Sequence, residues 1–248
     1  MATAAVTKPD YGVDAPAVLR NLFLFGSACL FAAGVIHAPI HIGNVILSLH
    51  SMFLWTGVAL VVEGFLYLLY VKVGKMHHRD SMLAFHAWRG DEQVLDVGCG
   101  RGLLLIGAAK RVGSAGRATG IDIWSTVDMG GNAMAATQKN IELEGVADRC
   151  TLVSAGAQEM PFGDGSFDVI VSNLCLHNIY DKPTRQRALA EIVRVLKPGG
   201  QAILSDYKLT SQYGAYLRGA GFEVAKKRGS MWATFPPLTV VVARKPAA

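Results

Sequence analysis

The chain has 248 residues, of which 51% are hydrophobic and only 17% charged, and its formal net charge is +5. Soluble domains usually carry about 25% charged residues, so this composition disfavours an ordinary soluble enzyme. The length of the chain fits one domain plus an appendage. Basic residues do not form runs interleaved with aromatic residues, which argues against a nucleic-acid-binding role.

The apolar residues concentrate in residues 22–71, where Glu63 is the only formally charged residue. After a segment of residues 1–21, in which Pro16 marks a helix start with Asp14 as N-cap, two apolar runs are separated by a turn rich in proline, glycine and asparagine. Each run approaches or exceeds the roughly 20 residues that cross a bilayer. The sequence therefore predicts a transmembrane helical hairpin. A soluble apolar cap over the active site is the alternative.

Basic residues flank both ends of the predicted hairpin, whereas its loop carries neither Lys nor Arg. They are Lys8 and Arg20 on one side and Lys72, Lys75 and Arg79 on the other. The positive-inside rule then places both termini and the remaining domain in the cytoplasm, on a multi-pass membrane protein with two helices. The four scattered cysteines, which have no C-x-x-C spacing, fit a reduced compartment.

Small residues on the first helix suggest a close-packed hairpin and a possible homo-oligomer through the transmembrane helices. They are Ala28, Cys29, Ala32, Ala33 and Gly34. A carboxylate inside a membrane helix costs at least about 2.5 kcal/mol unless it is paired or protonated. Glu63 therefore predicts a partner, for which His50 is a candidate.

From residue 93 to residue 248, after a linker helix within residues 72–92, apolar strands and amphipathic helices alternate. This pattern predicts an α/β domain with a doubly wound, mostly parallel sheet. Strands are predicted at residues 93–97, 118–122, 151–154, 169–172 and 202–205, with helices at 77–88, 103–111, 131–144 and 182–196.

The first of these strands runs into a glycine-rich turn in which Gly98, Gly100 and Gly102 occupy every second position. Glycines at this spacing let the backbone approach a ligand closely, and the following helix start offers free amide donors. A dinucleotide-binding fingerprint would need its third glycine at Leu103, so a nicotinamide oxidoreductase is disfavoured. Asp96 precedes the glycines, and Asp122 ends the next strand, where a carboxylate accepts ribose hydroxyls.

Two further motifs follow, the predicted strand in residues 166–173 and the helix end predicted at residues 196–200. Together, these motifs make the chain resemble the class I S-adenosylmethionine-dependent methyltransferases. Within that class it resembles the branch of ubiquinone/menaquinone C-methyltransferases (methyltransferase type 11). The resemblance spans about residues 91–206. It implies S-adenosylmethionine as cofactor and a Rossmann-like seven-stranded sheet whose edge is an antiparallel pair at residues 222–226 and 238–243.

The resemblance also implies where the cofactor binds. The methionine moiety would lie on Asp96 and the turn Gly98, Cys99, Gly100 and Gly102, the ribose on Asp122, the adenine on Ile123, and the reacting methyl near Asn173. The family usually has Gly-Asp-Ala after the third strand, but this chain has Ala155-Gly156-Ala157. We expect the backbone of Gly156 and Ala157, or the Gln158 amide, to replace the missing carboxylate.

Candidate catalytic residues follow the fourth and fifth strands. His177 can accept a proton near neutral pH or, alternatively, orient its loop; Asn178 and Asp206 are further candidates. Tyr11 and Asp14 reach the site only if the amino-terminal segment folds over it. Six of the seven histidines lie between residues 37 and 86, but their spacing does not favour a metal site, and none is predicted.

The sequence therefore predicts a membrane-anchored methyltransferase acting on a small or amphipathic acceptor, with a quinone-like or phenolic lipid as the best fit. Two alternatives stay open. One is a methyltransferase of a soluble metabolite that uses the hairpin only as an anchor. The other is a non-catalytic binding protein that has kept the fold, for which the missing acidic residue before Gln158 is the one indication.

Overall fold

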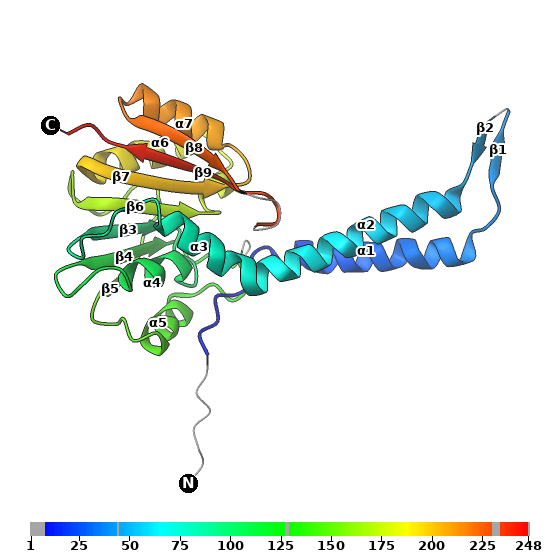
Figure 1. Cartoon of the computed structure of the whole chain (residues 1–248), viewed down its shortest axis with the longest axis horizontal. Coiled ribbons are helices and arrows are strands. Elements are labelled where there is room, and N and C mark those ends of the chain that lie inside the picture. Colours follow the sequence, from blue (N-terminus) through cyan, green and yellow to red (C-terminus); the bar gives the residue numbers. More distant parts are fainter. Residues whose placement is uncertain (1–7, 44, 127–128, 230–233, 248) are drawn as a thin grey trace, which may run out of the picture.

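A computed structural model describes residues 8–43, 45–126, 129–229 and 234–247. It consists of an α/β domain and a long helical hairpin that projects away from it (Figure 1). Because the hairpin touches the domain only at its base, it is not a cap over the domain.

The hairpin consists of α1 (Pro16–Val35) and α2 (Leu49–Leu69), which run antiparallel. Helix α1 begins at Pro16 as predicted, but the N-cap residue is Ala15 and the Asp14 side chain does not cap the helix. The turn between the helices is a small two-stranded ribbon, β1 (Ile40–Ile42) and β2 (Val45–Leu47), rather than the simple reversal expected. Helix α2 continues through the π-helical turn η1 (Tyr70–Gly74) into α3 (Lys75–Leu83).

The two long helices pack through Gly26 and Gly57, which lie outside the predicted close-packing face. A Cβ on Gly57 would lie 2.9 Å from the Leu30 amide nitrogen, and one on Gly26 would lie 2.9 Å from Val61 Cγ2. Ala33 is buried as predicted, whereas Ala28 and Gly34 face outward, so the expected close-packing face is only partly correct.

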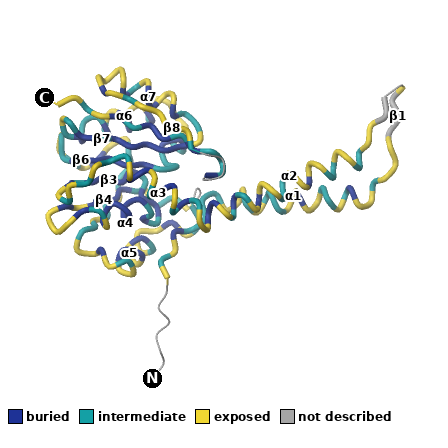
Figure 2. Tube along the Cα trace, in the orientation of Figure 1, coloured by how far each residue is buried: buried dark blue, intermediate teal, exposed yellow. Residues whose placement is uncertain are grey.

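Much of the hairpin is exposed (Figure 2). Its exposed residues include large apolar ones, among them Leu24, Phe25, Phe31, Trp55, Phe65 and Leu69. Both helices are long and apolar enough to cross a membrane. Glu63 is exposed as well. His50 does not pair with it, because His50 Nδ1 lies 2.8 Å from the Ala33 carbonyl oxygen on the neighbouring helix.

The domain is built on a seven-stranded sheet in the order β5-β4-β3-β6-β7-β9-β8. Its strands are β3 (Gln93–Val97), β4 (Arg117–Asp122), β5 (Cys150–Ser154), β6 (Phe167–Asn173), β7 (Leu196–Asp206), β8 (Glu223–Arg228) and β9 (Thr239–Arg244). All neighbours pair in parallel except β9, which is antiparallel to both β7 and β8. The predicted Rossmann-like, mostly parallel sheet is confirmed.

Side chains of the central strands pack alternately into two separate hydrophobic cores, because successive residues of a strand point to opposite faces of the sheet. Leu95 packs with α6 (Lys182–Val195) and α7 (Thr210–Gly219) on one face of the sheet. Val94 packs with α3, α4 (Leu103–Ala109) and α5 (Met134–Leu143) on the other. The strands are therefore apolar throughout, as both faces are covered.

Two predicted elements end or begin elsewhere. The linker helix stops at Leu83 rather than at residue 88, and Trp88 Nε1 donates a hydrogen bond to the Leu83 carbonyl at 2.8 Å. The segment expected to end a helix at residues 196–200 already belongs to β7, where Gly200 lets the chain pass close to the backbone of β6: a Cβ there would lie 2.9 Å from the Asp168 carbonyl oxygen.

The strand order reverses between β3 and β6, because the chain continues from β3 to β4 on one side and from β6 to β7 on the other. Ligands of open α/β sheets bind in the crevice at such a reversal. The base of the hairpin lies at the same edge of the sheet (Figure 1).

Candidate active site

The glycine turn after β3 has a conformation that only glycine adopts without strain. Gly98, Gly100 and Gly102 have φ values of +72°, +49° and +88°. A Cβ on Gly98 would lie 2.2 Å from Cys175 Sγ, and one on Gly100 would lie 3.0 Å from Met129 Cε. The loops that carry Cys175 and Met129 therefore pack directly against the backbone of this turn. No room is left for side chains at Gly98 and Gly100.

Asp96 lies directly before this turn and is almost completely buried. Its Oδ2 accepts a hydrogen bond from the Leu105 amide at 2.8 Å, which ties it to the first turn of α4. Burial raises the pKa of Asp96 to about 8; the Leu105 hydrogen bond lowers it, and the negative charge of Asp122 raises it further. A cationic ligand in the adjoining pocket would favour the ionised form.

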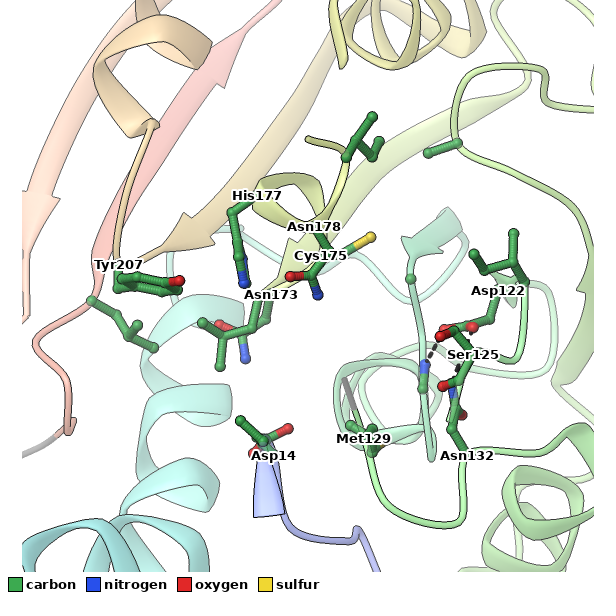
Figure 3. A pocket seen from close by; sticks show the side chains of 18 of the residues that line it. Asp14, Asp122, Ser125, Met129, Asn132, Asn173, Cys175, His177, Asn178 and Tyr207 are labelled. Carbon is green, nitrogen blue, oxygen red and sulfur yellow. Dashed lines mark hydrogen bonds between the residues drawn. The ribbon is translucent and has the colours of Figure 1, made fainter. Parts of the chain in front are cut away.

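Asp122 ends β4, and its carboxylate is held by three donors. It accepts hydrogen bonds from the Gly100 amide at 2.8 Å, the Trp124 amide at 2.6 Å and Asn132 Nδ2 at 3.2 Å. These contacts fix the carboxylate at the rim of the cavity (Figure 3). There it can accept hydrogen bonds from the hydroxyl groups of a ligand.

A cavity of about 530 Å³ lies above the strand crossover. It is lined by nine predicted site residues: Gly98, Gly100, Asp122, Ile123, Ala157, Gln158, Asn173, His177 and Asn178. Asp96 and Cys99 line a small adjoining pocket of about 40 Å³. Gly102, Gly156 and Asp206 are not among the residues that line either pocket.

The loop after β5 lacks the acidic side chain of the family pattern, and an amide occupies the space beside it. The Gln158 side chain folds back over Gly156, where a Cβ would lie 2.5 Å from Gln158 Nε2. Gln158 and Ile123 both line the cavity. An amide side chain, with one donor and one acceptor group, therefore lies on this loop next to the cavity.

His177 lies in the short helix η2 (Leu176–Asn178) after β6, opposite Asp122 in the cavity (Figure 3). Its Nδ1 is 2.8 Å from Asp206 Oδ1, an ion-pair distance, although the approach is too bent for a hydrogen bond. The backbone amide of His177 donates to Asp206 Oδ2 at 3.2 Å, and the Tyr207 ring packs edge-on at 4.7 Å between centroids. Asp206 therefore fixes the loop that carries the imidazole.

The amino-terminal strap, residues 10–15, folds over the site. This is the arrangement on which the prediction that Tyr11 and Asp14 reach the site depended. Lys75 Nζ donates to the backbone carbonyls of Tyr11, at 2.9 Å, and Gly12. Arg101 Nη2 lies 2.9 Å from Asp10 Oδ2, and the Tyr67 hydroxyl donates to the Asp14 carbonyl. These contacts direct the Asp14 side chain into the cavity (Figure 3).

Several buried polar atoms around the cavity have no hydrogen-bond partner among the described residues. They are Arg101 Nε, Asn132 Oδ1, His177 Nδ1, Tyr70 Oη and Asn173 Oδ1, of which the last two belong to side chains that interact with each other. Buried polar groups are normally paired, so these atoms and the glycine cradle fit a polar ligand. Within the described ranges, no three His, Cys, Asp or Glu side chains come close enough to hold a metal ion.

Comparisons with known proteins agree with this geometry. Residues 95–204 match the family described as Methyltransferase domain. The chain is similar to the demethylmenaquinone methyltransferase of Symbiobacterium thermophilum, with 33% identity over 162 residues that cover 65% of this chain and 57% of that protein. It is also similar to sterol 4-C-methyltransferase strm-1 of Caenorhabditis elegans, with 36% identity over 48% of this chain and 32% of the relative.

Among solved structures, a SAM-dependent methyltransferase from Aquifex aeolicus superimposes with a TM-score of 0.54 and 20% identity, covering 67% of this chain and 88% of that one. The chain spans about half the length of the curated relatives that it matches. The domain is thus of the S-adenosylmethionine-dependent methyltransferase class, whose cofactor is S-adenosylmethionine.

Proposed function

We propose that this protein is a membrane-anchored enzyme that moves a methyl group from S-adenosylmethionine to an amphipathic acceptor. The observation that carries the proposal is one cavity in which the glycine cradle and Asp122 face His177. A cofactor cradle and a group able to take a proton are the two parts that such a transfer needs from the protein.

The residues around the cradle divide the work of holding the cofactor. The amides of the Gly98–Gly102 turn and Asp96 hold the methionine end, Asp122 the ribose, and Ile123 with Gln158 the adenine. When bound, the sulfonium supplies an electrophilic methyl group, so the chain's main task is to align the acceptor.

His177 takes the proton that the acceptor loses when its new bond to the methyl carbon forms. The nearby carboxylate of Asp206 stabilises the imidazolium that results. Asn178, next to His177 in the cavity lining, orients a polar group of the acceptor. Each of these roles needs the short helix after β6 to stay in place.

The hairpin anchors the enzyme in the membrane. Helix α2 has 21 residues and rises about 30 Å, which matches the hydrocarbon thickness of a bilayer, and its large apolar side chains face outward. Lys and Arg at the base support a cytoplasmic orientation of the domain. A homo-oligomer through the helices would supply the exposed Glu63 with a partner.

Two relatives support the choice of acceptor class, since they are named for demethylmenaquinone and for sterols. Both are amphipathic lipids, and a membrane anchor concentrates the enzyme in the layer that holds such molecules. A quinol or phenolic lipid is therefore the acceptor that we propose. A soluble metabolite would make the hairpin only an anchor.

The test uses the full chain in phospholipid vesicles with S-adenosylmethionine labelled in its methyl group. Vesicles containing the quinol of demethylmenaquinone should yield label in the lipid extract, and His177→Ala should lower that rate at least tenfold. His77→Ala, at an exposed histidine outside the cavity, is the matched control. Cofactor binding without transfer to any lipid or aqueous acceptor would favour the non-catalytic alternative.

A further inference from the structure

The base of the hairpin forms part of the cavity wall. Val18 of α1, Tyr67 of α2 and Tyr70 of η1 all line the same cavity as Asp122 and His177. A hairpin that served only as an anchor would not need to contribute these side chains.

The π-helical turn gives this contact its geometry. Tyr67, Tyr70 and Val71 are all buried, and they form one apolar cluster with Leu238, packed against Leu174 and Phe235 of the domain. Single π-helical turns are often found at functional sites. Here the turn lies where α2 leaves its exposed apolar stretch and meets the domain.

The cavity lies at the level where the apolar surface of the hairpin ends. Val18 is two residues from Arg20, and Tyr70 is two residues from Lys72, so both lie within about 3 Å along the helix axis of these basic residues. Lys and Arg side chains at such positions reach the headgroup region. In the proposed orientation, the wall formed by the hairpin therefore faces the membrane interface.

The lining of the cavity combines polar and apolar side chains. His177 and Asn173 of the domain and the Tyr70 hydroxyl of the hairpin base provide polar groups. Val18 of the hairpin and Leu174, Phe235, Pro236 and Leu238 of the domain provide apolar groups. A ligand with a polar head and an apolar tail matches this arrangement.

We infer that the hairpin supplies one wall of the acceptor site, and that a lipid acceptor enters sideways from the membrane interface past Val18. Its polar ring lies between His177 and Tyr70, and its apolar tail leaves along the hairpin into the bilayer. This inference rests on the proposed function, and it makes Val18 and Tyr70 specificity-determining residues. The occupant is an amphipathic quinol or phenol with an apolar chain.

A pair of substitutions on the hairpin tests the route. Val18→Trp places a bulky ring at the wall, and Val62→Trp places the same ring on the outer surface of α2, away from the cavity; the two valines are 50% and 49% exposed. Both variants are reconstituted in vesicles containing the quinol of long-chain demethylmenaquinone. The measurements are methyl transfer to the quinol and the Kd of S-adenosylmethionine.

Val18→Trp should lower kcat/KM for the long-chain quinol at least tenfold and leave the Kd for S-adenosylmethionine within twofold of wild type. Val62→Trp should stay within twofold in both. Equal activity of the two variants would overturn the inference, as would a loss of cofactor binding in Val18→Trp, since Val18 would then act on the cradle. A wild-type chain that binds cofactor but methylates no acceptor would instead refute the proposed function.

Discussion

Replacing Gly98 by alanine tests the structural basis of the cofactor cradle. Gly98 has φ +72°, and an added Cβ would lie 2.2 Å from Cys175 Sγ and 2.5 Å from Cys175 Cβ. The left-handed backbone costs an alanine roughly 1–2 kcal/mol, and overpacking a tight site costs about 1–3 kcal/mol more. Gly98→Ala should therefore destabilise the domain by about 2–5 kcal/mol.

Gly145→Ala is the matched control, since Gly145 has φ +68° and no atom within 4 Å of an added Cβ. It should cost only the backbone share of about 1–2 kcal/mol. Denaturant unfolding and calorimetric titration with S-adenosylmethionine measure both variants. Gly98→Ala should also bind the cofactor at least 100-fold more weakly, because Cys175, which lines the cavity, must shift. Equal stability and equal affinity of the two variants would show that the close contact between Gly98 and Cys175 does not shape the cradle.

Three further predictions concern single polar groups. Asp122→Ala removes the acceptor of three hydrogen bonds and should raise the Kd for S-adenosylmethionine at least 100-fold by calorimetry, while Asp148→Ala, at an exposed carboxylate, should not. Asp96 binds its proton more tightly when folded, with a pKa of about 8 against 3.8, so the cofactor-free chain should lose stability as the pH rises from about 4 to about 8. Thermal unfolding across that range should show this loss in wild type and a smaller one in Asp96→Asn; parallel curves would contradict it. Tyr70→Phe should raise KM for the acceptor quinol severalfold without changing the Kd for S-adenosylmethionine, and an unchanged KM would exclude a positioning role for the hydroxyl.

The sheet and the cofactor cradle were predictable because local patterns determine them. The central strands β3 and β6 are mostly apolar runs that are buried on both faces of the sheet. The glycines of the turn after β3 can be recognised from their spacing alone. Asp122 could be placed because the carboxyl ends of neighbouring parallel strands meet at one edge of the sheet.

The contribution of the hairpin base could not be predicted, because it depends on contacts between segments that are distant in sequence. The strap is held by Lys75 and Arg101, which pair with backbone and carboxylate groups more than 60 residues away. Tyr70 reaches the cavity through a π-helical turn that has no clear sequence signal. The glycine contacts between α1 and α2 depend on their register, which the apolar composition leaves undetermined.

The most direct test of the account is an experimental structure of the full chain with S-adenosylhomocysteine at saturating concentration. We predict the amino-acid end of the ligand on the turn from Gly98 to Gly102 and its ribose hydroxyls within hydrogen-bond distance of the Asp122 carboxylate. An empty cavity under these conditions, or a ligand bound elsewhere on the chain, would contradict the account.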